Sequence, residues 1–176
     1  MTEASPPPPV ATIVIFGATG DLTRRLLMPA LVNLLRAGLL DPNTALLGVS
    51  HGAGSDSTLR EKLAEFVEDC PEWREWRGHI GYLAGDFADP GLYDTLARRF
   101  DGNGGGDCAT APSFFAPIVE ALGKAGLFDE TKGFRRVVVE KPFGSDLASA
   151  QELNRRLLAQ AQEGQIYRID HFLGKE

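Results

Sequence analysis

Cysteine is scarce in this sequence of 176 residues, which contains Cys70 and Cys108 and no Cys-x-x-Cys pair. Two cysteines are too few for a disulfide framework, and no spacing typical of a metal site or of a nucleophile–base pair occurs. No apolar run approaches the roughly 20 residues of a membrane span, and the amino terminus lacks the apolar core of a signal peptide. We therefore expect a cytoplasmic protein with no metal and no membrane partner.

Positive charge is also in the minority, since 18 Lys and Arg residues face 24 Asp and Glu residues and the formal net charge is -6. This balance argues against nucleic acid as a partner. It leaves room for a local basic site that binds a phosphorylated small molecule. The 43% of hydrophobic and 24% of charged residues are ordinary for a globular protein, and the length suits one domain.

The amino terminus differs in composition from the rest of the chain. Residues 1–10 include four consecutive prolines, which predict a disordered or polyproline II leader. The remaining residues, 11–176, alternate between apolar β-branched runs and amphipathic stretches. We expect them to form a single domain.

The first apolar run, at residues 11–16, leads into a glycine-containing turn and then into an apolar-periodic helix. Such a turn collects backbone N–H groups and the positive end of a helix at one point, which suits a pyrophosphate. Gly17 can adopt backbone angles closed to other residues, and Gly20 allows a ligand to approach the main chain. A Gly-x-x-Gly pair alone is also compatible with an ordinary strand–helix turn. The candidate cofactor-binding residues here are Gly17, Ala18, Thr19, Gly20, Asp21 and Leu22.

The helix after this turn is expected to begin near Asp21, whose carboxylate is placed to cap it. Pro29 is expected to bend the helix or to mark a later start, and Gly38 to end it. The leucines at the helical period predict its core face. They are Leu26, Leu27, Leu31, Leu34 and Leu35.

Strand and helix patterns alternate along the rest of the chain, which predicts an α/β fold with a doubly wound, mostly parallel sheet. Further strands are expected at residues 44–50, 79–83, 135–140 and 165–169, and further helices at residues 58–67, 89–100, 112–122 and 146–161. The stretch around Asp107 is too short and polar for a central strand. We therefore expect that one strand is lost near residue 107 or that the loop there is shortened.

The ends of two of these strands carry candidate ligand contacts, because ligands of open α/β sheets bind at the carboxyl ends of the strands. At the tip of the second strand of a dinucleotide fold, an acidic residue reads a ribose 2′-hydroxyl and a basic one accommodates a 2′-phosphate. His51 stands at this tip and is neither case cleanly, since imidazole is only partly charged at neutral pH. It is read either as a cofactor contact or as an ordinary loop histidine. Lys141 ends the strand at residues 135–140.

Three stretches of the chain resemble motifs of the glucose-6-phosphate dehydrogenase family, in the order in which that family has them. They are Gly-Ala-Thr-Gly-Asp-Leu at residues 17–22, Glu-Lys-Pro-Phe-Gly at residues 140–144 and Arg-Ile-Asp-His-Phe-Leu-Gly-Lys-Glu at residues 168–176. A nine-residue match of the last kind is very specific. The resemblance spans nearly the whole chain after the leader.

The resemblance implies that residues 17–22 hold the pyrophosphate of NADP, that Asp86 lies on the adenine side, and that Lys141 reaches both the nicotinamide and the sugar. His51 stands where the family usually has an arginine that binds the 2′-phosphate. NAD therefore stays possible beside NADP as the cofactor.

The last motif implies the substrate contacts. His171 and Lys175 resemble the residues that bind glucose 6-phosphate, and Asp170 resembles the carboxylate that orients the catalytic histidine. Such a carboxylate fixes the tautomer of a general-base imidazole and stabilises its charged form. In the family this histidine and the subunit interface belong to a second, C-terminal catalytic and dimerisation domain. We expect that domain to be absent from this chain.

The function implied by the resemblance is that of the coenzyme-binding part of an NADP-dependent glucose-6-phosphate dehydrogenase. This oxidoreductase of the pentose phosphate pathway oxidises glucose 6-phosphate at C1 to 6-phosphogluconolactone, and the full-length family forms homo-oligomers. The isolated chain lacks the general base and is expected to be inactive. The alternative is a non-catalytic NAD(P)-binding module that senses cofactor or docks on a partner. A small reductase is disfavoured, because no tyrosine is followed by lysine in a Tyr-x-x-x-Lys pair.

Overall fold

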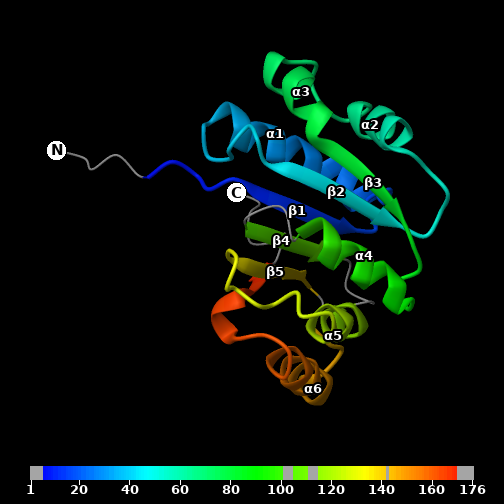
Figure 1. Cartoon of the computed structure of the whole chain (residues 1–176), viewed down its shortest axis with the longest axis vertical. Helices are drawn as coiled ribbons and strands as arrows, with labels where there is room; N and C mark the ends of the chain where they lie inside the picture. Colours follow the sequence, from blue (N-terminus) through cyan, green and yellow to red (C-terminus); the bar gives the residue numbers. More distant parts are fainter. Residues whose placement is uncertain (1–5, 101–104, 111–114, 142, 170–176) are drawn as a thin grey trace.

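The computed structural model describes residues 6–100, 105–110, 115–141 and 143–169, with residues 105–110 described by their backbone. Within these ranges strands and helices alternate along the chain (Figure 1). The strands are β1 (Ala11–Phe16), β2 (Ala45–Ser50), β3 (Ile80–Ala84), β4 (Gly105–Thr110), β5 (Arg135–Glu140) and β6 (Ile166–Ile169). The α-helices are α1 (Met28–Arg36), α2 (Asp56–Ala64), α3 (Pro71–Trp76), α4 (Pro90–Phe100), α5 (Phe115–Lys124) and α6 (Leu147–Leu158). A π-helical turn (Thr23–Leu27) precedes α1, and short 3₁₀ turns (Arg77–His79 and Glu163–Gln165) precede β3 and β6.

The strands form one six-stranded sheet in the order β3-β2-β1-β4-β5-β6, and every neighbouring pair is parallel. The chain first builds the sheet outward from β1 to β3 and then returns to build the other half from β4 to β6. This order confirms the doubly wound α/β fold expected from the alternation. The change of direction lies between β1 and β4, and ligands of such sheets bind at that switch point.

The strand expected to be lost near residue 107 is present, so that prediction was wrong. Residues 105–110 form β4 in the centre of the sheet, where Cys108 pairs with Val14 of β1 and with Val137 of β5. Ladder hydrogen bonds use backbone groups, which glycine and polar residues supply as well as valine does. Pairing with the apolar strands β1 and β5 therefore stabilises β4, which the composition of residues 105–110 does not predict.

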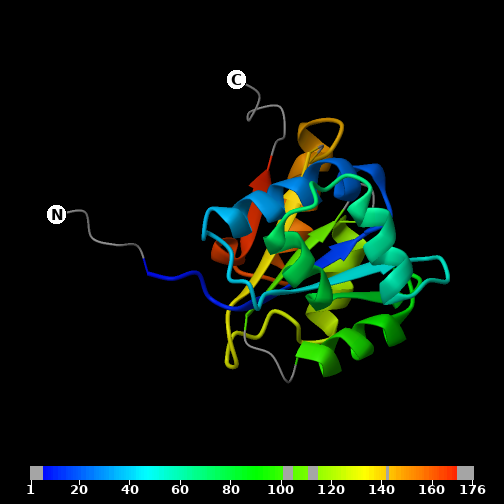
Figure 2. The ribbon, with the colours of Figure 1, turned by 90° about the horizontal axis from the view of Figure 1, so that it is seen from above.

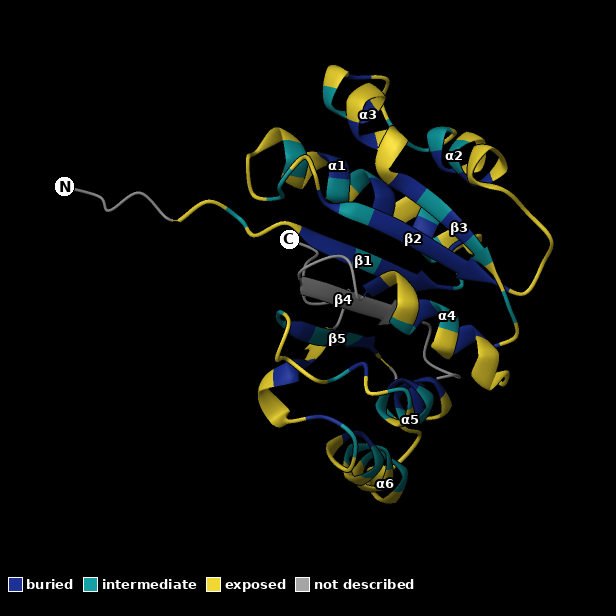
Figure 3. Cartoon of the chain, viewed as in Figure 1, coloured by how far each residue is buried: buried dark blue, intermediate teal, exposed yellow. Residues whose placement is uncertain are grey.

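Among the described residues, three α-helices pack on each face of the sheet. Helices α1, α2 and α3 pack on one face in a core that includes Ile15, Val32 and Trp76. Helices α4, α5 and α6 pack on the other in a core that includes Val14 and Val137. Figure 2 shows α1 and α4 on opposite sides of the strands, and Figure 3 shows that β1 and β2 are buried between them. Right-handed crossovers require this division, because the two halves of the sheet are built in opposite directions.

The helix after the turn has a different phase from the one expected. Its first part is the π-helical turn, and α1 itself begins at Met28 with Pro29 in its first turn. A π turn contains more residues than an α turn and so rotates the faces of the helix that follows. As a result Met28 and Val32 are buried, while Leu26 is 53% and Leu34 39% exposed, which corrects part of the predicted core face. Leu27, Leu31 and Leu35 are partly buried and pack against the core, as expected. Gly38 follows the end of the helix with a φ of +67°, as expected.

Candidate functional site

The carboxyl ends of the strands lie in one row of the sheet. When the pairing registers are followed across the sheet, the positions that come level are Gly17 after β1, Ser50 of β2, Ala84 of β3, Glu140 of β5 and Ile169 of β6. His51, Asp86 and Lys141 each follow this row within two residues. Three strand spacings, about 14 Å, separate the ends of β2 and β5. An elongated ligand is therefore needed to touch both His51 and Lys141.

The turn after β1 is held against the end of β2. Gly17, with a φ of +81°, donates its N–H to the carbonyl oxygen of Val49 at 2.8 Å, and Ala18 donates to the same oxygen at 3.2 Å. The N–H of Gly20 donates to the carbonyl oxygen of Gly17 at 2.9 Å. A Cβ built on Gly20 would lie 3.1 Å from that oxygen, so a side chain fits poorly there. Both glycines thus have a conformational or steric reason to be where they are.

The hydroxyl groups of this region add a second connection. Thr19 Oγ1 lies 3.2 Å from Ser50 Oγ, and the N–H of Thr19 donates to Ser50 Oγ at 3.4 Å. The helical stretch then begins at Asp21, where the first N–H groups have no acceptor within the helix. Such groups at a helix start, next to a glycine turn, are suited to a phosphate.

The carboxylate of Asp21 was expected to cap the helix, but the structure shows that it does not. It accepts a hydrogen bond from Arg24 at 2.6 Å and lies 3.8 Å from Arg25, and the helix start carries no side-chain cap. Both guanidinium groups also lie 5.2 Å from the ring centroid of Phe66. The two arginines are therefore engaged with Asp21 and Phe66 beside the turn.

His51 lies in a small cluster made by two strand ends. Its ring centroid is 4.3 Å from that of Phe87, and its Nδ1 is 3.8 Å from Oδ1 of Asp86. Asp86 is placed by the N–H of Ala88, which donates to the same Oδ1 at 2.9 Å. Phe87 is buried and meets Phe16 edge to face at 5.5 Å. The imidazole of His51 therefore lies against the buried ring of Phe87 and beside the carboxylate of Asp86.

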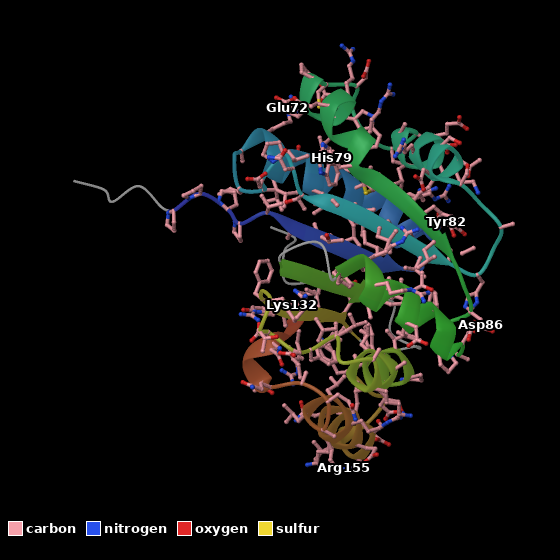
Figure 4. The ribbon with its side chains drawn as sticks, viewed as in Figure 1. Glu72, His79, Tyr82, Asp86, Lys132 and Arg155 are labelled. Atoms are coloured by element: carbon pink, nitrogen blue, oxygen red, sulfur yellow. The ribbon has the colours of Figure 1, made fainter. Side chains whose placement is uncertain are left out.

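Figure 4 shows Asp86 beyond the carboxyl end of β3, on the edge toward which the arrows of β1 and β2 point, and His79 at the opposite end of β3. His79 thus lies at the amino ends of the strands, opposite to the candidate site. Among the described residues, no group of histidine, cysteine, aspartate or glutamate is arranged to hold a metal ion. The same part of the chain contains no helix that is long and apolar enough to cross a membrane.

Lys141 directly follows β5 and is exposed. Its backbone N–H donates to the carbonyl oxygen of Ile169 at 3.2 Å. The segment after it is fastened to α6, because Ser149 Oγ accepts from the N–H groups of Ser145 and Asp146 at 3.0 Å. The N–H of Ser149 donates to Asp146 in return and lowers the pKa of that carboxyl. The predicted substrate and positioning residues Asp170, His171 and Lys175 lie outside the described residues.

An apolar cavity of about 520 Å³ runs from the turn across the open half of the sheet. No helix of α4, α5 or α6 covers this face, because all three pack on the other one. Its walls come from the turn, from α1 and from β5 and β6, and include Gly20, Leu31, Leu34, Val138 and Tyr167. The turn and the ends of β5 and β6 therefore border a single cavity.

Sequence reasoning missed three parts of this site. Phe87 follows Asp86 directly, and its position after a strand end could have suggested the contact with His51. The partnership of Thr19 with Ser50 joins residues 31 positions apart and has no local signal. The cavity has no local signal either, because its walls combine residues of β1, α1, β5 and β6.

A protein family and three known proteins resemble this chain over more than nine tenths of its length. Residues 14–176 match the family "Glucose-6-phosphate dehydrogenase, NAD binding domain". The glucose-6-phosphate 1-dehydrogenase of Aggregatibacter actinomycetemcomitans is 39% identical over 180 residues, which cover 93% of this chain and 36% of that protein. The chain therefore spans about a third of the length of this curated relative.

Two solved structures of this family superpose closely. A glucose-6-phosphate dehydrogenase in complex with its substrate glucose 6-phosphate has a TM-score of 0.87 and 33% identity, over 99% of this chain and 39% of that one. The glucose-6-phosphate 1-dehydrogenase of Mycobacterium avium has a TM-score of 0.83 and 40% identity, over 94% of this chain and 37% of that one.

Proposed function

Because the chain belongs to the glucose-6-phosphate dehydrogenase family, as its NAD-binding domain, we propose that it binds NADP along the carboxyl edge of the sheet. The residues that would hold the pyrophosphate are Gly17, Ala18, Thr19, Gly20, Asp21 and Leu22. His51 and Asp86 would meet the adenosine half. Lys141 follows β5, about three strand spacings from the end of β2, and would reach the nicotinamide half.

The observation that carries this proposal is the row of level strand ends. It puts the glycine turn between His51 on one side and Lys141 on the other. A pyrophosphate bound at the turn would therefore be flanked by groups that suit both halves of a dinucleotide. The turn supports the phosphate role independently, since the glycine conformation and the helix start are both present there.

We propose further that this binding serves the oxidation of glucose 6-phosphate at C1 to 6-phosphogluconolactone, with NADP as hydride acceptor. In that reaction Lys141, His171 and Lys175 would bind the sugar phosphate, and Asp170 would orient a general-base histidine from another part of the enzyme. Lysine suits the role at residue 141, because its ammonium is a mobile point charge with three donors. Residues 11–176 would be the coenzyme-binding domain of that enzyme.

Two measurements on the purified chain test the proposal. Calorimetry should detect binding of NADP and of NAD, and a spectrophotometric assay with glucose 6-phosphate should detect no NADP reduction, because we propose that the general-base histidine comes from another part of the enzyme. Failure to bind either dinucleotide would contradict the cofactor role. Turnover at a rate typical of enzymes would contradict the proposed origin of the general base. Binding of dinucleotide without turnover, even when the family's second domain is supplied, would favour a non-catalytic module.

A further inference from the structure

We propose that Tyr82 of β3 is a positioning residue for the dinucleotide. Its side chain lies against the segment that follows β2, residues 51–54, and holds this segment in the shape that meets the adenosine half of the cofactor. The inference rests on the proposed function and concerns the same site. Tyr82 itself is buried and is not among the residues proposed to touch the ligand. Figure 4 shows Tyr82 on β3, on the side of the loop that joins β2 to α2.

The hydroxyl of Tyr82 contacts the backbone on both sides of His51. It donates to the carbonyl oxygen of Gly52 and lies 3.4 Å from the carbonyl oxygen of Ser50. The oxygen of Ser50 also accepts the N–H of Gly85 at 3.0 Å. Because a planar peptide unit cannot rotate without moving its carbonyl oxygen, these contacts restrict the backbone that carries the imidazole.

The ring of Tyr82 makes a second contact, with Gly54. A Cβ built on Gly54 would lie 2.8 Å from Cε1 and 3.0 Å from Cζ of the tyrosine. The backbone of the segment thus packs directly on the ring, at a distance that leaves no room for a side chain.

The backbone of Tyr82 makes a third contact, at the far end of the segment. Its N–H donates to Oδ1 of Asp56, the first residue of α2, at 2.7 Å. Tyr82 therefore contacts the chain at residues 52, 54 and 56. Residues 51–54 are exposed and include two glycines, so packing of their own side chains contributes little to their order.

The order of this segment matters for binding, because the tip of the second strand of a dinucleotide fold meets the adenosine ribose. Each residue that a ligand must order costs conformational entropy, and a segment that is ordered in advance avoids that cost. Loss of the Tyr82 hydroxyl should therefore weaken binding without removing any group that touches the ligand.

Tyr82→Phe tests the hydroxyl, because it keeps the ring. Calorimetry should show that the affinities for NADP and for adenosine 2′,5′-bisphosphate, a probe of the adenosine half alone, fall by the same factor. The expected factor is about three- to tenfold, the range for the loss of one hydrogen bond. Unchanged affinities, or a fall for NADP without a fall for the adenosine probe, would overturn the inference.

Trp76→Phe is the matched control. Trp76 is also a buried aromatic donor, and its Nε1 donates to the carbonyl oxygen of Thr44 at 2.7 Å, just before the amino end of β2. This variant should lose stability and leave both affinities unchanged. An equal fall in Trp76→Phe and Tyr82→Phe would mean that general destabilisation is responsible, which would also overturn the inference.

Two glycine substitutions test the contact with the ring. Gly54→Ala forces a Cβ against the ring and should lower both affinities, whereas Gly52→Ala places its Cβ in open space and should leave them unchanged. Both substitutions restrict the unfolded chain in the same way, so that effect cancels in the comparison. Equal affinities of the two variants would overturn the contribution of the ring.

Backbone order parameters from nuclear magnetic resonance separate positioning from a general loss of stability. For residues 51–54 of free Tyr82→Phe they should fall from about 0.85, typical of rigid backbone, toward about 0.6. Saturation with NADP should restore them, and free Trp76→Phe should show no fall. Rigid residues 51–54 in free Tyr82→Phe would overturn the inference and leave the proposed function standing. Failure of the unaltered chain to bind NADP or NAD would contradict the proposed function itself.

Discussion

The hydroxyl groups of Thr19 and Ser50 lie 3.2 Å apart and join the turn after β1 to the last residue of β2. Ser50 is buried, and its Oγ also accepts the N–H of Thr19 at 3.4 Å. The carbonyl oxygen of Val49, one residue earlier, accepts two further N–H groups of the turn. The shape of the proposed pyrophosphate site thus depends on the second strand as much as on its own glycines.

Replacement of Ser50 by alanine should loosen this turn. Ser50→Ala removes both contacts to Thr19, and we expect the affinities for NADP and NAD to fall together by about two- to fivefold, with a loss of stability of about 1 kcal/mol. Calorimetry and urea unfolding measure the two effects. Thr131→Ala, which removes a hydroxyl from an exposed turn, is the control. A fall confined to NADP would place Ser50 at the 2′-phosphate instead.

Gly48 of β2 lies directly beneath the turn. A Cβ added there would be 2.7 Å from Cβ of Ala18 and 2.6 Å from Cδ2 of Leu59, both closer than packing allows. We expect Gly48→Ala to destabilise the protein by about 1–3 kcal/mol and to weaken dinucleotide binding by displacing Ala18.

The matched control is Gly81→Ala on the neighbouring strand, where the added Cβ would meet Leu47 at an ordinary 3.6 Å. Thermal unfolding and calorimetry of the two variants check the prediction. Equal effects of the two substitutions would mean that strand propensity, and not the contact with Ala18, is responsible.

An ion pair between α5 and α6 should make stability depend on acid pH. Arg156 donates to Glu120 at 2.6 Å and thereby lowers the pKa of that carboxyl. Because the folded pKa is the lower one, the pair stabilises the fold above the unfolded value near 4.3, and this contribution is lost as the pH falls through the folded value.

Glu120→Gln should therefore lower the free energy of unfolding at pH 7 by up to about 1 kcal/mol, with the difference disappearing at strongly acid pH. Urea unfolding at a series of pH values measures it. Glu61→Gln, at an exposed position of α2, is the control. A difference that persists at acid pH would mean that the substitution acts through packing rather than charge.

The cavity over β5 and β6 should bind an apolar fluorescent dye. Leu34, 39% exposed, and Tyr167, 51% exposed, both line it. The double variant Leu34→Ser, Tyr167→Ser should lose at least half of the dye fluorescence, because it removes apolar surface from both walls. Leu147→Ser removes a leucine that is 74% exposed on α6 and should change little. Equal losses in the two variants would show that the dye has no preference for the cavity.

Local patterns of the sequence are enough to place most elements. The apolar run at residues 135–140 and the amphipathic stretch at residues 146–161 predict β5 and α6 within a few residues, because side-chain periodicity follows backbone geometry directly. Expectations based on long-range effects were less accurate. The strand at residues 105–110 was not expected, because its pairing depends on neighbours distant in the sequence.

By itself the sequence determined the type and order of most elements, β4 excepted, and the residues that follow the strands it predicts, including the glycine turn, His51 and Lys141. These are properties of short segments, set by local backbone preferences and by the period of burial. Only the tertiary structure decided that these residues share one edge, that Phe87 and Asp86 flank His51, and that half of one sheet face stays open. Strand order, register and the phase of the π turn decide these relationships. They arise from hydrogen bonds and packing between segments that no local pattern connects.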